Sequence, residues 1–491
     1  MRFGTPDTGR DFLRYIAEHD KSKTRWDNLE TGAFVFWYRG SPRPLGAGNI
    51  FSHAPIPAES VWTDDPSLNV SGMTLISLNP LGRLTQFVIV PPQVEEPAGV
   101  APLPDWAPLF SAAGLDRAKW PPAQPMWTPP VYSDARTAWT GSLAERPAIP
   151  LRIEAAAYRG RPVYFELIGP WTRPERMQPY RDWTLFERVG LVIFTVFLLA
   201  VLITSAMLAR RNLRLGRGDR RGAFRLAAFV FAAFGVAWLF GAHHVPNFWE
   251  MGLFNEFLAR ALEFSCLMWV VYIALEPYVR RRWPATLVSW SRLLAGGFRD
   301  PLVGRDLLVG CFLAPFSTAA QRLAWFVFFW LGYPPAQPDS GPNWQFLGAR
   351  TIVADVASSL FLAPFFWLTA LFVLFLLRVL LRKEWAAAVA WVLLFTVFLV
   401  LGGPFDPVVL VGTLIFLGLA VFVMIRFGLL ALVTNFVAYN ILQDYPLTTQ
   451  GSAWYAGIGL AGILVIAAMA LYGFYTSLGG RPVFGGAVLE E

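Results

Sequence analysis

Residues 189–214 read VGLVIFTVFLLAVLITSAMLARRNLR, an uncharged apolar run from Val189 to Ala209 that ends in a cluster of arginines. A helix needs about 20 apolar residues to cross the hydrocarbon core of a bilayer, so this run predicts a membrane span. Seven further runs of similar character follow at residues 224–242, 254–276, 307–333, 353–381, 385–402, 408–425 and 453–475. The sequence therefore predicts an α-helical multispan membrane bundle of about eight transmembrane helices over residues 186–491.

The basic residues between these runs fall on alternate loops. The first, third, fifth and seventh loops hold seven, six, three and one of them: Arg210, Arg211, Arg214, Arg217, Arg220, Arg221, Arg225; Arg280, Arg281, Arg282, Arg292, Arg299, Arg305; Arg378, Arg382, Lys383; and Arg426. The opposite loops contribute only Arg350. Positively charged loops stay in the cytoplasm, so we expect residues 1–185 to form an extracytoplasmic domain of an inner (plasma) membrane protein. After eight spans, the C-terminal tail is expected on that outer side as well.

An exported domain needs a segment that exports it, and residues 1–10 (MRFGTPDTGR) lack the apolar core of a signal peptide. We therefore expect a membrane segment upstream of Met1 in the native protein. The alternative is a reversed arrangement with residues 1–185 in the cytoplasm, which the arginine bias disfavours.

Composition supports a membrane protein and limits its partners. The 491 residues are 55% hydrophobic, with a mean hydropathy of +0.44. The net charge of +7 comes from the basic loops, so it indicates attraction to the lipid bilayer, and nucleic acid is not an expected partner. The two cysteines, Cys266 and Cys311, lie in predicted spans, so the N-terminal domain is expected to fold without disulfides.

The pattern of residues 1–185 is typical of an α+β domain. Helical spacing is found at residues 11–19 and 106–113, and an aromatic strand at 33–39, with a proline-rich crossing at 120–130. Turn residues separate two pairs of β-rich runs, 73–78 with 84–90 and 151–157 with 162–168, which predicts two hairpins in a small antiparallel sheet covered on one face by helices. No catalytic motif is present, and the tryptophans of this domain favour core packing over a ligand groove.

A cluster of ionisable residues lies within predicted spans, where charge is costly and usually paired or functional. Glu256, Arg260 and Glu263 share one helix face, and Arg322 and Asp355 are placed at a similar depth. They are candidate ligand-binding residues in a single polar pocket with a ligand-binding or proton-sensing role, and the alternative is a set of structural ion pairs. The neighbouring His243 and His244 are weak metal candidates, because adjacent helical residues point about 100° apart. No catalytic residue and no cofactor are expected.

Two shorter segments are expected to lie along the membrane surface. Residues 283–298 combine tryptophans with arginines, as interfacial helices do. Residues 428–442 are apolar but short, which predicts a re-entrant or interfacial helix. A ninth span at that position would invert the C-terminal tail.

Eight strings of the sequence are distinctive: EPYVRRRWP (276–284), SWSRLL (289–294), RDPLVGRD (299–306), FWYR (36–39), SPRPL (41–45), VPPQ (90–93), AAAYRGRP (155–162) and RRNLRLGRGD (210–219). They resemble the non-catalytic exported and multispan portion of bacterial receptor-type serine/threonine protein kinases. The resemblance implies a cytoplasmic kinase domain upstream and a membrane span that exports residues 1–185. The chain itself has no phosphate-covering glycine loop, no His-Arg-Asp loop and no Asp-Phe-Gly triplet. It is therefore not expected to phosphorylate a substrate alone.

The sequence thus favours a membrane-embedded sensor and signal-transmission module that binds a signal ligand of unknown identity. The alternative is a polytopic transporter with the intramembrane charges on its substrate path, although paired broken helices are not evident. An intramembrane enzyme is disfavoured, because paired metal ligands and a nucleophile motif are lacking.

Overall fold

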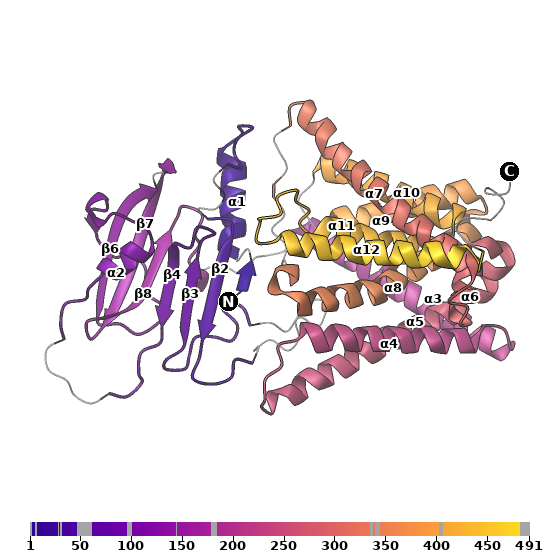
Figure 1. The fold of residues 1–491 in the computed structure, drawn as a ribbon, viewed down its shortest axis with the longest axis horizontal. Helices are drawn as coiled ribbons and strands as arrows, with labels where there is room; N and C mark the ends of the chain where they lie inside the picture. Colours follow the sequence, from indigo (N-terminus) through magenta and orange to yellow (C-terminus); the bar gives the residue numbers. More distant parts are fainter. Residues whose placement is uncertain are drawn as a thin grey trace, which may run out of the picture.

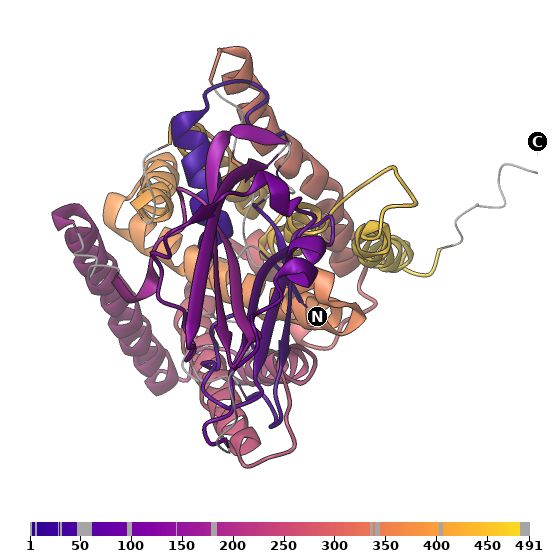
Figure 2. The same ribbon diagram turned by 90° about the vertical axis from the view of Figure 1, so that its left-hand side faces the viewer.

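The computed structural model describes residues 2–4, 7–27, 29, 32–46, 61–95, 101–143, 145–177, 184–333, 337–338, 344–401 and 406–481. It contains an N-terminal sheet domain and a helical region, which lie side by side along the long axis of the molecule (Figure 1). Seen from the sheet, the strands stand in front of the helices (Figure 2). The chain is therefore a multispan membrane protein with an α/β region at its N-terminus.

The N-terminal domain is built on an eight-stranded antiparallel sheet with the strand order β1-β2-β3-β4-β8-β7-β6-β5. The strands are β1 (Arg2–Gly4), β2 (Val35–Gly40), β3 (Thr74–Leu78), β4 (Leu84–Ile89), β5 (Pro122–Ala123), β6 (Ala135–Leu143), β7 (Arg146–Tyr158) and β8 (Arg161–Ile168), with helices α1 (Asp7–His19) and α2 (Ala107–Ala112). Both predicted hairpins are confirmed as β3–β4 and β7–β8.

Local backbone chemistry explains the two hairpins. Gly82 closes the first at φ +77°, a conformation that most other residues avoid. Arg159 and Gly160 close the second with φ angles of 50° and 76°. Two positive values in succession are typical of the type I′ turn, whose twist matches the twist of the strands that it joins.

The two faces of the sheet bury different side chains. Phe110 of α2 makes edge contacts with Trp139 at 5.0 Å and with Phe165 at 5.9 Å between ring centroids. The opposite face buries Trp37 and Tyr164 together with aliphatic residues of β3 and β4. The tryptophans at positions 37, 106, 120 and 139 are buried, as expected for core packing.

The helical region contains α3 (Leu185–Arg214), α4 (Arg220–Gly241), α5 (Trp249–Arg282), α6 (Pro284–Leu294), α7 (Pro301–Trp330), the short helix η4 (Trp344–Leu347), α8 (Ala349–Leu381), α9 (Glu384–Leu401), α10 (Pro407–Arg426), α11 (Leu429–Asp444) and α12 (Ala456–Ser477). Among the described residues, seven helices are long and apolar enough to cross a membrane: α3, α4, α5, α7, α8, α10 and α12. The sixth predicted span forms the shorter apolar helix α9. The multispan character is therefore confirmed, and the count of eight stays a prediction.

The helical region has two chemically different ends. One, which we name the sheet end, contacts the N-terminal domain: Lys23 Nζ lies 5.3 Å from the centroid of the Phe329 ring, and the rings of Phe36 and Trp454 are 5.9 Å apart. The other, which we name the arginine end, gathers the arginine-bearing loops around α6 (Figure 1). There, Arg225 Nη1 donates to Leu294 O over 2.7 Å. The two ends lie on opposite sides of the apolar helices.

The segment expected to be a re-entrant or interfacial helix at the membrane surface, residues 428–442, forms α11 inside the bundle. Eleven of its 16 residues are buried, and its partners along α7 advance from Gly310 near Asn435 to Arg322 near Gln443. The surface location is therefore corrected: α11 runs parallel to α7 through the interior. Polar side chains pair between these two helices, so α11 needs no apolar face toward lipid.

The additional passage by α11 changes where the chain leaves the bundle. The Tyr472 hydroxyl of α12 donates to Phe298 O over 2.6 Å, and Gly473 packs directly on Gly304 near the start of α7. The last described turn of α12 therefore lies at the arginine end. This differs from the expected tail on the sheet side and agrees with the alternative of an additional crossing.

The other predicted surface segment forms α6, which closes the arginine end. It contacts α4, α5, α7, α10 and α11, with Leu287 and Trp290 buried. Pro284 starts it at a position where the missing backbone N–H is tolerated.

Candidate functional site

The five intramembrane candidate residues occupy different surroundings in the fold. On α5, Arg260 Nη2 lies 2.8 Å from Glu256 Oε1, and both side chains are largely buried. Glu256 Oε2 is buried and accepts no hydrogen bond from the described residues. Glu263, one turn further along, is exposed on the outer surface of the bundle. The structure thus pairs the first two residues and leaves the third outside that pair.

Arg322 belongs to a row of polar side chains between α7 and α11. Its Nη2 donates to Gln443 Oε1 over 2.9 Å. Gln443 in turn donates to the Tyr439 hydroxyl over 2.9 Å, and that hydroxyl donates to Gln321 Oε1 over 2.5 Å. Deeper in the bundle, Asn435 Nδ2 lies 3.4 Å from Ser317 Oγ. This row satisfies polar groups that lipid would leave unpaired.

Asp355 lies on α8 beside two neutral polar side chains, Gln345 of η4 and Tyr445 at the end of α11. Gln345 and Tyr445 are buried, with 5% and 3% of their surface exposed. Arg322 and Asp355 therefore flank the same end of α11, the first through Gln443 and the second through Tyr445. The Glu256–Arg260 pair lies elsewhere, on α5.

One of the two histidines that follow α4, His244, forms a hydrogen bond with the next helix. His244 Nδ1 lies 2.6 Å from Glu250 Oε1, and the Trp238 ring packs edge-on against the His244 ring at 4.8 Å. Within the described ranges, no group of three His, Cys, Asp or Glu residues gathers as a metal ion would require. The His244–Glu250 contact instead stabilises the α4–α5 loop against the start of α5.

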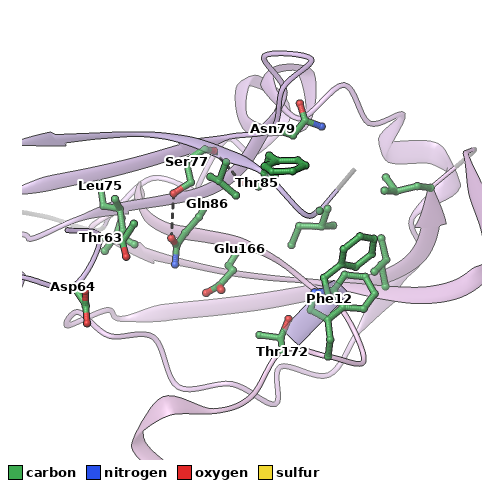
Figure 3. A pocket seen from close by; sticks show the side chains of 18 of the residues that line it. Phe12, Thr63, Asp64, Leu75, Ser77, Asn79, Thr85, Gln86, Glu166 and Thr172 are labelled. Carbon is green, nitrogen blue, oxygen red and sulfur yellow. Dashed lines mark hydrogen bonds between the residues drawn. The ribbon is translucent and has the colours of Figure 1, made fainter. Parts of the chain in front are cut away.

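The N-terminal domain contains a cleft of about 260 Å³ beside its sheet (Figure 3). Ser77, Gln86 and Glu166 line its floor from β3, β4 and β8, while Phe12 of α1 and Trp171 contribute aromatic surface. Hydroxyl, amide and carboxylate groups beside aromatic rings suit a small polar ligand that carries hydrogen-bonding groups and one apolar side.

Buried hydrogen bonds hold the floor of this cleft. The Tyr164 hydroxyl donates to Glu166 Oε2 over 2.6 Å. Burial, followed by the Glu166 carboxylate, raises the pKa of Tyr164 above its ordinary value of 10.0, so the phenol stays a neutral donor. The Tyr164 hydroxyl therefore fixes the orientation of the Glu166 carboxylate, which lines the cleft.

A buried arginine holds the loop that walls the cleft. Arg39 of β2 donates to Trp62 O over 3.0 Å, to Thr63 O over 2.8 Å and to Pro66 O over 2.5 Å. Burial lowers the pKa of Arg39, while Asp64 and Asp65 oppose this shift. Since Thr63 and Asp64 also line the cleft, Arg39 is a positioning residue for it.

A series of aromatic contacts links the cleft-bearing sheet to the polar end of α11. Phe36 on β2 contacts Trp454 in the loop before α12, and Trp454 contacts Phe346 of η4 at 5.3 Å. The residue before Phe346 is Gln345, the neighbour of Asp355. The aromatic contacts therefore connect the sheet, through three rings and one short helix, to the half-buried carboxyl of Asp355.

Sequence reasoning did not identify the cleft, Arg39 or the row that includes Gln443. The cleft combines α1, strands β2, β3, β4, β6, β7 and β8, and loops that are distant in the sequence, and Gln443 lies 121 positions from Arg322. A local signal existed only for α11, where Asn435, Tyr439 and Gln443 recur at every fourth position. Comparisons with protein-family models, with curated proteins and with solved structures give no match.

Proposed function

We propose that this chain is the sensor and signal-transmission module of a membrane receptor. A small polar ligand in the sheet-domain cleft alters the position of β2, and the change passes through Trp454 and η4 to the helices. The observation that carries this proposal is the contact series Phe36–Trp454–Phe346, which starts on β2, the strand that supplies Val35 to the cleft.

The cytoplasmic output in this proposal is a kinase domain supplied upstream. Its support is the resemblance of the exported and membrane strings to bacterial receptor-type serine/threonine kinases, together with the absence of phosphoryl-transfer motifs in this chain. The sheet end then faces the periplasm or exterior, and the arginine end faces the cytoplasm. In this arrangement the helices carry a conformational change across the membrane.

Coupling can be tested before the ligand is known by filling the cleft with a side chain. Gln86→Trp places an indole in the cleft of the full chain, reconstituted in lipid nanodiscs, and hydrogen exchange is followed by mass spectrometry. We expect altered exchange not only in β3 and β4 but also in residues 443–447 and in α6. A ligand can shift a conformation only through differential contacts, and the indole supplies such contacts artificially.

The same experiment in a Trp454→Ala background isolates the proposed route. The response of residues 443–447 to Gln86→Trp is expected to disappear, while the response within the sheet persists. Trp330→Ala is the matched control, because Trp330 is 92% exposed and lies outside the contact series. The proposal is contradicted if Gln86→Trp alone leaves the exchange of residues 443–447 unchanged. It is also contradicted if Gln86→Trp alters that exchange equally with and without Trp454→Ala.

A transporter is the second candidate, and the polar row between α7 and α11 is the observation that favours it. Gln321, Tyr439, Gln443 and Arg322 are joined by hydrogen bonds between α7 and α11, from the buried Tyr439 to the exposed Arg322, as in a polar substrate path. Transport predicts solute flux in proteoliposomes that Arg322→Ala abolishes. Sensing predicts ligand binding to the sheet domain without flux.

A further inference from the structure

A basic cavity of about 500 Å³ lies where two helix junctions meet at the arginine end. Its lining comes from Arg282 and Trp283, between α5 and α6, and from Arg378, Val379, Arg382 and Glu384, between α8 and α9. Two helices end here and two begin, so the partial charges of the helix ends largely offset each other. The side-chain charges then decide which ligand fits.

Those charges leave a positive excess. Glu384 is the one carboxylate in the lining, and it holds the two junctions together: its Oε1 lies 3.3 Å from Arg378 Nη2 and 3.5 Å from Trp283 Nε1. In the part of the chain that the structure describes, no carboxylate pairs with the side chains of Arg282 and Arg382. Both are exposed at the cavity, and guanidinium groups match the geometry of phosphate oxygens.

The backbone conformation of Arg382 indicates that this arginine has a role other than stabilising the fold. Arg382 caps the C-terminus of α8 in the left-handed conformation, at φ 62° and ψ −8°. Glycine is the usual residue at such a position, because a Cβ there is strained. The chain instead places a guanidinium at the cavity, while Arg378 Nη1 binds the carbonyl of Arg382.

Apolar surface beside the cavity distinguishes a lipid from a soluble anion. The last turn of α8 and the start of α9 expose Val379 (49%), Leu380 (76%) and Trp385 (68%) next to the basic groups. An amphiphile can place a phosphate in the cavity and its acyl chains along this surface, with tryptophan at the level of the headgroups. Basic pockets between membrane helices are known to select anionic headgroups.

We infer that this cavity binds the phosphate headgroup of an anionic glycerophospholipid, which joins the α5–α6 junction to the α8–α9 junction. The bound lipid stabilises the arrangement of α6, which lies across the ends of five helices. The inference requires only that the arginine end lies at a membrane surface, so it holds for a sensor and for a transporter alike.

The test uses the purified full chain in detergent, with lipids added at increasing concentration and thermal unfolding followed by tryptophan fluorescence. Phosphatidylglycerol is expected to raise the unfolding temperature, with a smaller effect from phosphatidylcholine. Arg282→Gln and Arg382→Gln are each expected to weaken the apparent affinity for phosphatidylglycerol about fivefold, since one basic residue near an anionic surface contributes about 1 kcal/mol. Arg299→Gln is the matched control, because Arg299 is exposed at the same end but lies outside the lining.

Arg382→Gly separates lipid binding from folding. Glycine relieves the left-handed strain at this position, so the lipid-free unfolding temperature is expected to be equal to or above that of the parent, while the response to phosphatidylglycerol weakens. Inorganic phosphate or glycerol phosphate alone is expected to give no shift. Equal effects of the two lipids, a full response in the Arg282 and Arg382 variants, or a shift produced by inorganic phosphate alone would each overturn the lipid site.

Discussion

At the scale of single residues, Asn212 of α3 compensates for a proline in α5. Pro277 has no backbone N–H to donate to Ile273 O, the carbonyl four residues earlier. Asn212 Nδ2 donates to that oxygen over 2.9 Å, and its side chain is buried. Asn212→Leu is therefore expected to lower the free energy of unfolding by about 1–3 kcal/mol, the cost of one buried unpaired carbonyl.

A second substitution checks this explanation. Pro277→Ala restores the backbone donor, so the loss caused by Asn212→Leu is expected to be smaller in the Pro277→Ala background. Thermal unfolding of the four proteins in detergent gives the coupling energy of this double-mutant cycle. Additive effects would show that Asn212 stabilises the helices in some other way.

Tyr164 predicts a specific sensitivity of the sheet domain to alkali. Its pKa is raised above 10.0 in the folded chain by burial and by Glu166, whereas the unfolded phenol ionises near 10. Unfolding above that pH therefore releases a proton, so stability is intact below pH 10 and falls as the pH rises further, by up to about 1.4 kcal/mol per pH unit. Tyr164→Phe is expected to flatten this dependence between pH 10 and 11 in unfolding experiments.

The control for this prediction is Tyr132→Phe, which replaces a phenol that is 71% exposed. An unchanged pH dependence in Tyr164→Phe would mean that the Tyr164–Glu166 hydrogen bond does not hold the cleft floor in solution.

At the scale of elements, the contact of α7 with α11 depends on Gly310. A Cβ at this position would lie 2.5 Å from Thr434 Cβ and 2.6 Å from Ala431 O, so any side chain forces the helices apart. Gly310→Val is expected to destabilise the bundle by about 1–3 kcal/mol, as overpacking does. Gly418→Val is the control, since nothing lies within 4 Å of a Cβ at Gly418. Equal thermal stability of the two variants would argue against the buried position of α11.

The elements that could be predicted are those with a strong local signal. The membrane spans could be predicted from the long apolar runs. The two hairpins could be predicted from the turn at Gly82 and from the pair Arg159-Gly160. The strand β6 was missed, because ARTAWTGSL lacks an apolar alternation. The location of α11 was misjudged because its 16 residues are short for a span, and its polar side chains are satisfied by α7 rather than by water.

At the scale of the whole molecule, the candidate site could be predicted only in part. The spacing of Glu256 and Arg260 is enough to expect their ion pair. The grouping of Arg322 and Asp355 around the end of α11, and the aromatic contacts through Trp454, depend on how distant segments meet. The sheet and the arginine-bearing loops lie at opposite ends of the helical region, an arrangement that the distribution of arginines among the loops had already predicted.

Cysteine labelling on intact cells tests this central arrangement most directly. In a background of Cys266→Ala and Cys311→Ala, single cysteines replace Leu81 in the β3–β4 turn, Arg217 in the α3–α4 loop and Arg481 after α12, all three exposed. An impermeant thiol reagent is expected to label position 81 on intact cells, and positions 217 and 481 only after permeabilisation. Labelling of position 217 on intact cells, with position 81 protected, would contradict the sidedness on which the sensor proposal depends.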